Sequence, residues 1–339
     1  MAETVNLSVD EVRSLSTEVL IANGMSDTNA DVVADVVTQA EADGTHSHGL
    51  FRIPGYVSSM RSGRMDGKAV PEVNDKSPGL VAVDSRGGFS PPAILAGKPL
   101  ATEKAKSQGI SVLGLRNNGN LNALWWEAER FGEEGLICLT MSTSQSFVAP
   151  WGGNRALFGT DPIAFACPRD GKPPMVFDYA TSASARGEIQ VAAREGHSIP
   201  KGWALDKDGN DTTDPAAALD GVQLPFGGHK GNAIMIMVEL LAAGLTGGNF
   251  CFEAQEQIEK FGANDAGPSS AGQVFILIDP KGFHTTFLQR VEGLFDQILA
   301  QDGTRIPGDR RYANRRRSAI EGIECQAALY QEILDMRSR

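Results

Sequence analysis

Two of the five histidines in the chain stand in one tripeptide, His46-Ser47-His48, with glycines at positions 44 and 49. Histidine exchanges protons near neutral pH, and glycines on both sides permit a tight turn that exposes the side chains. Arg52 follows four residues after His48, and a guanidinium can bind a carboxylate through two hydrogen bonds. The segment therefore predicts a site in which Arg52 holds the carboxylate of a substrate and His48 acts as a general acid beside it.

Other interpretations of this segment stay open at this point. His46 and His48 have the spacing of a metal-binding pair, which would need further ligands such as His197 or His229 and would indicate a metal-dependent hydrolase. Ser47 is a poor candidate nucleophile, because G-x-S-x-G is missing around it and a serine rarely forms a triad with the next residue in sequence. A polar turn between two helices, without any chemistry, is the remaining alternative.

Two glycine-containing segments are suited to an anion. Residues 225–231, PFGGHKG, precede an apolar helical stretch, so their backbone amides and Lys230 can meet negative charge at a helix N-terminus. Residues 305–311, RIPGDRR, form a Pro-Gly turn that displays adjacent arginines and is suited to phosphate. Their structural alternatives are a glycine-rich connector and a solvated basic face, and residues 315–317 fit a basic face better.

Two turns next to apolar strands carry polar side chains. In residues 158–162, FGTDP, Thr160 can bind a ligand oxygen or only the backbone of the turn. In residues 177–182, FDYATS, a strand runs into a helix, and Ser182 can face a ligand or serve as a simple helix N-cap. Both segments are candidate ligand contacts rather than assigned ones.

Composition and charge narrow the class of protein. The chain has 339 residues, 41% of them hydrophobic and 22% charged, as in globular proteins. Its net charge is −11, which disfavours a general nucleic-acid binder. The N-terminus lacks a signal-peptide pattern and no apolar run is long enough for a bilayer, so we expect a cytoplasmic protein without membrane or nucleic-acid partners. The four cysteines form no C-x-x-C pair, which argues against a zinc ribbon.

Hydrophobic periodicity predicts helices at both ends of the chain and a sheet between them. The expected strands are residues 80–83, 110–115, 136–141, 163–166, 175–178 and 274–279. The expected helices begin near residues 8, 27, 54, 93, 123, 183, 231, 285 and 327. Neither G-x-G-x-x-G nor the Walker pattern occurs, so any dinucleotide would be held without the Rossmann turn.

Four ordered motifs resemble one family. They are residues 43–56 (DGTHSHG…RIPGY), 158–165 (FGTDPIAF), 225–231 and 306–311. The chain resembles the non-Rossmann malate/L-lactate dehydrogenase family over roughly residues 8–335. Within that family, residues 191–196 and 238–250 are most similar to the reductases of Δ1-piperideine-2-carboxylate and Δ1-pyrroline-2-carboxylate.

The resemblance implies a fold and an activity. The fold is α/β and non-Rossmann, with a largely antiparallel central sheet that binds NAD(P)H (114–284) and a helical substrate and dimer lobe (1–113 with 285–339). The activity is reduction of the cyclic imino acids to L-pipecolate and L-proline by a homodimer, with NADPH, or alternatively NADH, as cofactor. An NAD(P)-dependent 2-hydroxy acid dehydrogenase, a metal-dependent hydrolase and a cofactor-binding protein without turnover are the alternatives; no metal is expected.

The resemblance also assigns residues. His48 would be the proton donor, Ser47 its hydrogen-bonding partner and Glu188 a relay, while Arg52 and Thr160 would hold the substrate carboxylate. The cofactor would contact Asn120, Leu121, Asn122, Ala123, Leu124, Asp178, Tyr179, Ala180, Arg186, Gly187, His229, Lys230, Arg305, Ile306, Pro307, Gly308, Asp309, Arg310 and Arg311. Two positions depart from the family pattern: Asn120 replaces a histidine common in relatives, and Glu188 replaces the aspartate of the reductases.

Overall fold

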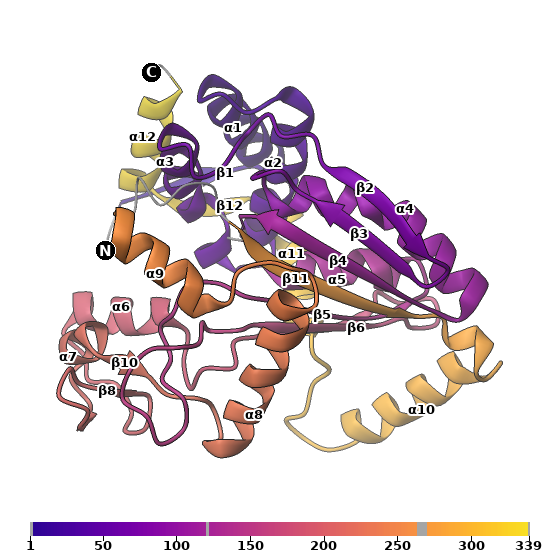
Figure 1. Ribbon diagram of the computed structural model, residues 1–339. Helices are drawn as coiled ribbons and strands as arrows, with labels where there is room; N and C mark the ends of the chain where they lie inside the picture. Colours follow the sequence, from indigo (N-terminus) through magenta and orange to yellow (C-terminus); the bar gives the residue numbers. More distant parts are fainter. Residues whose placement is uncertain (1–2, 120–121, 263–269, 338–339) are drawn as a thin grey trace.

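A seven-stranded sheet crosses the middle of the molecule in the computed structural model, which describes residues 3–119, 122–262 and 270–337 (Figure 1). The strands lie in the order β2-β3-β4-β11-β5-β6-β7. Among these neighbours β3 and β4 run parallel, and the other pairs are antiparallel. The strands are β2 (Glu72–Ser77), β3 (Leu80–Asp84), β4 (Ile110–Asn118), β5 (Ile137–Ser142), β6 (Ile163–Cys167), β7 (Met175–Tyr179) and β11 (Ala271–Ile278). The expectation of a largely antiparallel, non-Rossmann sheet is confirmed.

Helices cover both faces of this sheet. Successive side chains along its strands point to opposite faces, and both faces are apolar. The helices α4 (Ser90–Gln108) and α5 (Leu124–Glu133) pack on one face, where Cys138 of β5 is buried. The helix α8 (His229–Val238) continues into a π-helical segment, η3 (Glu239–Gly244), and both pack on the other face against Met141 of the same strand. Side chains three residues apart on β5 therefore point to opposite layers, as a strand requires.

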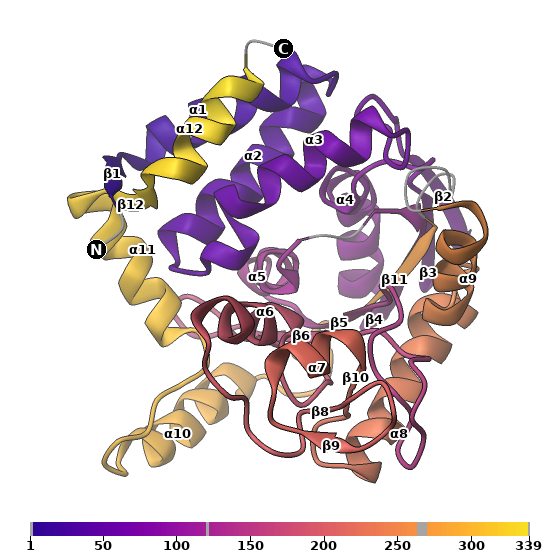
Figure 2. The same cartoon turned by 90° about the vertical axis from the view of Figure 1, so that its left-hand side faces the viewer.

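Both ends of the chain build one helical lobe above the sheet (Figures 1 and 2). Its helices are α1 (Val9–Ala22), α2 (Asp27–Ala42), α3 (Ile53–Arg61) and α12 (Ala327–Met336). The short strand β1 (Thr4–Leu7) pairs with β12 (Ile323–Gln326). Ser8 and Glu11 form the capping box that starts α1, and Ser26 caps α2, as their positions before apolar helical runs predict. The expected helical lobe is confirmed.

The remaining elements lie around the lower half of the molecule. They are α6 (Arg186–Glu195), β8 (Ala204–Leu205), β9 (Asp211–Thr212), α7 (Pro215–Asp220), β10 (Val222–Gln223), α9 (Cys251–Phe261) and α10 (Phe287–Leu299). Figure 2 shows α10 projecting away from the body. The expected domain limits at residues 113 and 285 stay a prediction. Residues 72–84, which lie in the segment expected to belong to the helical lobe, supply β2 and β3 of the sheet. No helix in the described ranges has the length and hydropathy to cross a bilayer.

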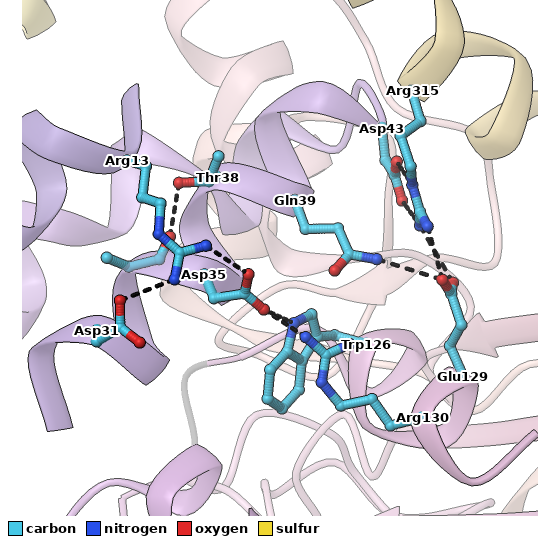
Figure 3. Close-up of polar contacts among 11 residues, drawn as sticks. Arg13, Asp31, Asp35, Thr38, Gln39, Asp43, Trp126, Glu129, Arg130 and Arg315 are labelled. Atoms are coloured by element: carbon cyan, nitrogen blue, oxygen red, sulfur yellow. Dashed lines mark hydrogen bonds and ion pairs between the residues drawn. The ribbon is translucent and has the colours of Figure 1, made fainter. Parts of the chain in front are cut away.

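The helix α11 (Asp309–Glu321) joins the lobe to the sheet layer. Arg315 on α11 donates through Nε and Nη2 to both carboxylate oxygens of Asp43, each at 2.8 Å, and through Nη1 to Glu129 on α5 at 2.7 Å (Figure 3). Both acidic side chains are buried. The sequence placed Arg315 in a solvated basic face, and that interpretation is wrong, because two buried carboxylates meet at its guanidinium.

A second polar cluster holds α5 against α2 at Asp35, further from the end of α2 than Asp43. Asp35 accepts hydrogen bonds from the Trp126 indole at 3.0 Å and from Arg130, and Arg13 of α1 reaches the same carboxylate at 3.1 Å (Figure 3). The Arg130 guanidinium lies 3.7 Å from the centre of the Trp126 ring. The helix that leads directly into the His46–His48 segment is thus held on two sides.

Candidate active site

The residues 46–52 form two consecutive 3-10 turns, η1 (His46–His48) and η2 (Leu50–Arg52), between α2 and α3. The Ser47 hydroxyl lies 3.1 Å from His48 Nδ1. Burial, together with the positive charge of Arg52, lowers the pKa of His48 to about 4. The imidazole is therefore neutral at pH 7 in the ligand-free protein. A carboxylate bound to Arg52 would offset one of these two causes and make protonation of His48 easier.

Arg52 has a buried donor that no described residue satisfies. Its Nε atom is shielded from solvent and lacks a hydrogen-bond partner within the described ranges. A buried N–H without an acceptor costs about 1–3 kcal/mol, so the position favours a ligand that brings an acceptor. This geometry fits the carboxylate-holding role expected for Arg52, which stays a prediction.

One helical turn after Arg52, Tyr56 is buried on α3. Its hydroxyl donates to Asn122 Oδ1 at 3.2 Å, and Asn122 Nδ2 donates to Ser90 Oγ at 2.5 Å. Asn122, expected to touch the cofactor, thus links α3, α4 and the start of α5. The expected contacts Asn120 and Leu121 lie outside the described residues.

Thr160 lies in the turn before β6, as expected from the sequence. Its carbonyl accepts hydrogen bonds from the backbone N–H of Thr181 at 2.8 Å and from the Thr181 hydroxyl at 3.1 Å. The next residue, Asp161, has the left-handed φ of 40°, which costs a non-glycine residue free energy. Two hydrogen bonds from Thr181 therefore fix the backbone of Thr160, and its role toward a substrate stays a prediction.

Asp161 belongs to a buried acidic cluster that the sequence did not reveal. Its Oδ1 lies 3.4 Å from the Cys251 thiol, and the Cys251 amide donates to Glu239 Oε2 at 3.2 Å. Burial and the nearby Glu239 charge raise the pKa of Asp161 well above its ordinary value, and burial also raises that of Glu239. The three side chains are separated by 78 and 12 residues in sequence, so no motif could have grouped them.

The same cluster bears on the metal-hydrolase alternative. Within the described part of the chain, Asp161, Glu239 and Cys251 are the one set of three side chains whose ligand atoms lie close enough for a metal ion. Neither His46 nor His48 belongs to it. The Nδ1 atom of His46 contacts the Glu41 carboxylate, and that of His48 contacts Ser47. The structure thus does not gather the ligands that a His46–His48 metal pair would need.

The end of β7 meets the start of α5 at Asp178. Its carboxylate accepts the Trp125 amide at 3.0 Å and so caps α5, an arrangement that satisfies free N–H groups at a helix start. Burial raises the pKa of Asp178 to about 6. Tyr179 is exposed and stacks on Phe177, with ring centres 5.1 Å apart, and Ala180 follows it, half-buried. Ala123 and the buried Leu124 stand at the same helix start.

The first turn of α6 contains three expected site residues. Arg186 donates to the Leu219 carbonyl at 3.3 Å and lies over the Phe147 ring at 4.5 Å. Gly187 and Glu188 are exposed, and the Glu188 carboxylate has no hydrogen bond to His48 among the described contacts. The relay expected between Glu188 and His48 therefore stays a prediction.

The helix α8 begins at His229, after two glycines. Gly227 and Gly228 have φ values of 58° and 64°, a conformation that favours glycine. His229 and Lys230 are exposed, and His229 lines an open cleft of about 950 Å³. Free backbone amides and a lysine at one helix start suit a phosphate; the expected cofactor contact of His229 and Lys230 stays a prediction.

Residues 305–311 divide into a structural and a free part. Asp309 accepts the Ile306 amide at 3.1 Å, the Pro307 carbonyl accepts the Val176 amide, and Gly308 starts α11 with a φ of 99°. Arg311 donates to the Val176 carbonyl at 2.9 Å and lies 4.8 Å over the Trp125 ring. Arg305 and Arg310 are exposed and form no ion pair with any described residue, so they are the arginines available to an anion.

Sequence reasoning also missed Glu127, which is fully buried on α5. It accepts a hydrogen bond from Gln273 on β11. Burial raises the pKa of Glu127 to about 8, so it holds a proton at pH 7. An acidic residue within an apolar helix stretch, as in LWWEAERF, is the signal that could have found it.

Comparison with known proteins identifies the class. A profile described as malate/L-lactate dehydrogenase matches residues 7–334. The Δ1-pyrroline-2-carboxylate/Δ1-piperideine-2-carboxylate reductase of Pseudomonas syringae pv. tomato is 48% identical over 94% of this chain and 93% of its own. The crystal structure of Δ1-piperideine-2-carboxylate reductase from the same organism gives a TM-score of 0.93 at 46% identity, over 98% and 100% of the two chains. Sulfolactate dehydrogenase from Methanocaldococcus jannaschii gives 0.89 at 30% identity, over 98% and 97%.

Fold, site and relatives together define an oxidoreductase of the non-Rossmann type, whose group uses a nicotinamide cofactor. The turn with His48 and Arg52, and the exposed basic residues Lys230, Arg305 and Arg310, are consistent with that class. The chain belongs to the malate/L-lactate dehydrogenase family, which confirms the resemblance that its four motifs indicated.

Proposed function

We propose that the protein reduces the cyclic imino acids Δ1-piperideine-2-carboxylate and Δ1-pyrroline-2-carboxylate to L-pipecolate and L-proline. The observation that carries the proposal is the pairing, in one short segment, of His48 with an arginine whose buried Nε lacks a partner. Relatives named as reductases of these acids align with nearly the whole chain, which supports an imino acid over a 2-oxo acid.

The chain's own residues divide the work as follows. Arg52, with Thr160, binds the substrate carboxylate, and this fixes C2 of the ring. The cofactor supplies a hydride to C2 when bound. His48 donates a proton to the ring nitrogen. Binding of the carboxylate offsets the Arg52 charge that, together with burial, lowers the pKa of His48. Ser47 orients the imidazole through Nδ1.

NADPH is the proposed cofactor, with NADH as the alternative. The residues fit such a group: His229 and Lys230 are exposed at the start of α8, and Lys230 adds a positive charge there. The exposed Arg305 and Arg310 supply the isolated positive charge that a 2′-phosphate requires in a chain of net charge −11. These residues would hold the cofactor; Arg311 would support the segment.

The proposal includes a homodimer in the cytoplasm. Two features support self-association: Leu294 and Leu299 are exposed on the projecting α10, and Ile236, Leu240 and Leu245 are exposed along α8 and η3. Exposed apolar surface of this kind favours burial against a partner. Light scattering coupled to size-exclusion chromatography measures the mass in solution; a monomer at micromolar concentration would contradict the dimer.

A substrate panel tests the activity. Loss of NADPH absorbance is followed with the two imino acids and with three 2-oxo acids: pyruvate, oxaloacetate and the 2-oxo acid that corresponds to ureidoglycolate. Preference for the imino acids by at least tenfold in kcat/KM is expected, and preference for a 2-oxo acid would establish the hydroxy acid dehydrogenase alternative instead. His48→Ala should lower turnover by about 10²–10⁴-fold with NADPH binding retained; near-normal turnover would remove His48 from the mechanism.

A further inference from the structure

Glu41 is a buried acid at the end of α2 whose carboxylate faces the catalytic segment rather than solvent. Only 5% of the residue is exposed. Its Oε2 lies 2.5 Å from His46 Nδ1, and its Oε1 accepts the backbone N–H of Leu50 at 2.7 Å. The two contacts are at the two ends of a five-residue segment, and His48 is the central residue of that segment. One carboxylate therefore joins both ends of the turn that carries the proton donor.

The packing around Glu41 leaves little freedom to either partner. A methyl group at Gly49 would overlap the Glu41 carboxylate, so the backbone passes directly over these oxygens. The turn itself has few bonds of its own: the His48 amide donates to the Thr45 carbonyl at 2.9 Å, and the Gly49 amide to the His46 carbonyl at 3.1 Å. The side chains of Ser47 and His48 are not bonded to the body of the protein by any described contact.

The second 3-10 turn depends on the same anchor. Leu50 is the first residue of η2 and is fully buried, and Arg52 is its last. Because the Leu50 amide donates to Glu41, the carboxylate fixes the start of the turn that carries the substrate-binding arginine. Short 3-10 turns have weak internal hydrogen bonds, so an external anchor of charged character contributes strongly to their geometry.

We propose that Glu41 is the positioning residue of this active site, which sets the placement of His48 and Arg52 relative to each other through His46 and the Leu50 amide. The proposal rests on the proposed roles of His48 and Arg52. The Glu41 carboxylate contacts His46 and the Leu50 amide, so it acts through the residues on both sides of His48. Displacing a catalytic group by about 1 Å can cost on the order of 10²-fold in rate.

The test compares Glu41→Ala, Glu41→Gln and His46→Ala with a matched control, Glu292→Ala. Glu292 is also a well-paired carboxylate, bonded to Arg169 and Lys172 at 2.8 and 2.6 Å, but it lies on α10. Each variant is assayed on whichever acid the wild type reduces fastest, below its melting temperature, with NADPH affinity measured by fluorescence titration. Rates are expressed per NADPH-binding site, so a loss of folded protein does not count as a loss of turnover.

Glu41→Ala is expected to lower kcat by about 10–100-fold and raise the substrate KM, with NADPH affinity within twofold of the wild type. His46→Ala removes one of the two contacts from an exposed residue and should lower kcat about 3–10-fold without unfolding the protein. Glu41→Gln keeps an acceptor for the Leu50 amide and should recover most of the rate, and Glu292→Ala should leave it unchanged. A crystal structure of Glu41→Ala should show displaced His48 and Arg52 side chains.

Two results would overturn the proposal. One is a kcat per binding site for Glu41→Ala within twofold of both the wild type and Glu292→Ala. The other is a crystal structure of that variant with His48 and Arg52 in their original places. If Glu41→Ala does not fold, an unchanged kcat for His46→Ala overturns it. Failure of the imino acid assignment is seen separately, in the wild-type substrate panel.

Discussion

Replacing Arg315 by methionine should destabilise the protein because its guanidinium neutralises two buried carboxylates. The Asp43 and Glu129 side chains are 0% and 1% exposed, and the four bonds from Arg315 to them measure 2.7–3.2 Å. Methionine keeps much of the length and removes the charge. Breaking one side of a buried ion pair costs about 3–5 kcal/mol.

Two features reduce that cost toward the lower limit. Gln39 still donates to Glu129 at 3.3 Å, and Asp43, whose pKa burial already raises, can take up a proton. We therefore expect a loss of about 3 kcal/mol in the free energy of unfolding at pH 7. The remaining carboxylates bind protons more tightly in the folded than in the unfolded protein, so the deficit should grow as pH rises and shrink as pH falls toward 5.

The assay is urea denaturation followed by circular dichroism, with Arg13→Met as the matched control. Arg13 also pairs with two carboxylates, but it is 41% exposed and its partners Asp31 and Asp35 are 63% and 29% exposed; such pairs contribute about 0–1 kcal/mol. Adding Asp43→Asn and Glu129→Gln to Arg315→Met should recover part of the loss. A loss below about 1 kcal/mol, or one equal to that of Arg13→Met, would refute the reasoning.

Three further predictions concern the site. Arg52→Lys should weaken use of the acid substrate by about 1.5–3 kcal/mol in kcat/KM while Arg52→Gln raises the pKa of His48, seen by NMR of its ring proton; an unchanged pKa would contradict the charge effect. Arg310→Ala should lower NADPH efficiency about tenfold more than NADH efficiency, whereas Arg311→Ala should affect both coenzymes alike, and the reverse pattern would exchange their roles. The third prediction is that the buried Asp161 side chain positions the neighbouring Thr160. Asp161→Asn should retain the KM for the imino acid, because a protonated carboxyl group and an amide are alike in shape and hydrogen bonding, whereas Asp161→Ala should raise this KM. Equal effects of the two substitutions would show that the side chain does not position Thr160.

The sequence predicted most of the fold because the elements concerned have strong periodicity. All six expected strands occur, and the capping box at Ser8 starts α1. The helix α11 was missed, since its sequence DRRYANRRRSAIE is basic and has few apolar positions. It is held by Arg315 and by Tyr312, whose hydroxyl donates to the Pro174 carbonyl at 2.8 Å, and such tertiary bonds leave no periodic pattern.

The site was predictable where its parts are adjacent in the chain and not where folding assembles them. His48 and Arg52 stand in one segment, so their types and spacing were sufficient. The Asp161–Glu239–Cys251 cluster comes from three separate segments. The sequence motif predicts that Arg311 binds a phosphate, yet its guanidinium donates to a backbone carbonyl in the structure. The motif does not distinguish Arg311 from the neighbouring, exposed Arg310.

The pairing of β1 with β12 has a consequence for how the protein is made. On the ribosome, residues 4–7 emerge long before their partners, residues 323–326. The contacts that α11 makes with the end of α2, from Asn314 to the Asp43 carbonyl at 3.0 Å and from Ser318 to the Ala42 carbonyl at 2.9 Å, are equally late. The part of the apolar cluster of α1 and α2 that Ile323, Cys325 and Ile333 cover therefore stays exposed until those residues emerge, and transiently exposed apolar surface of this kind is prone to aggregation. The turn that carries His48 follows α2 directly, so the final position of His48 also depends on residues that are synthesised much later.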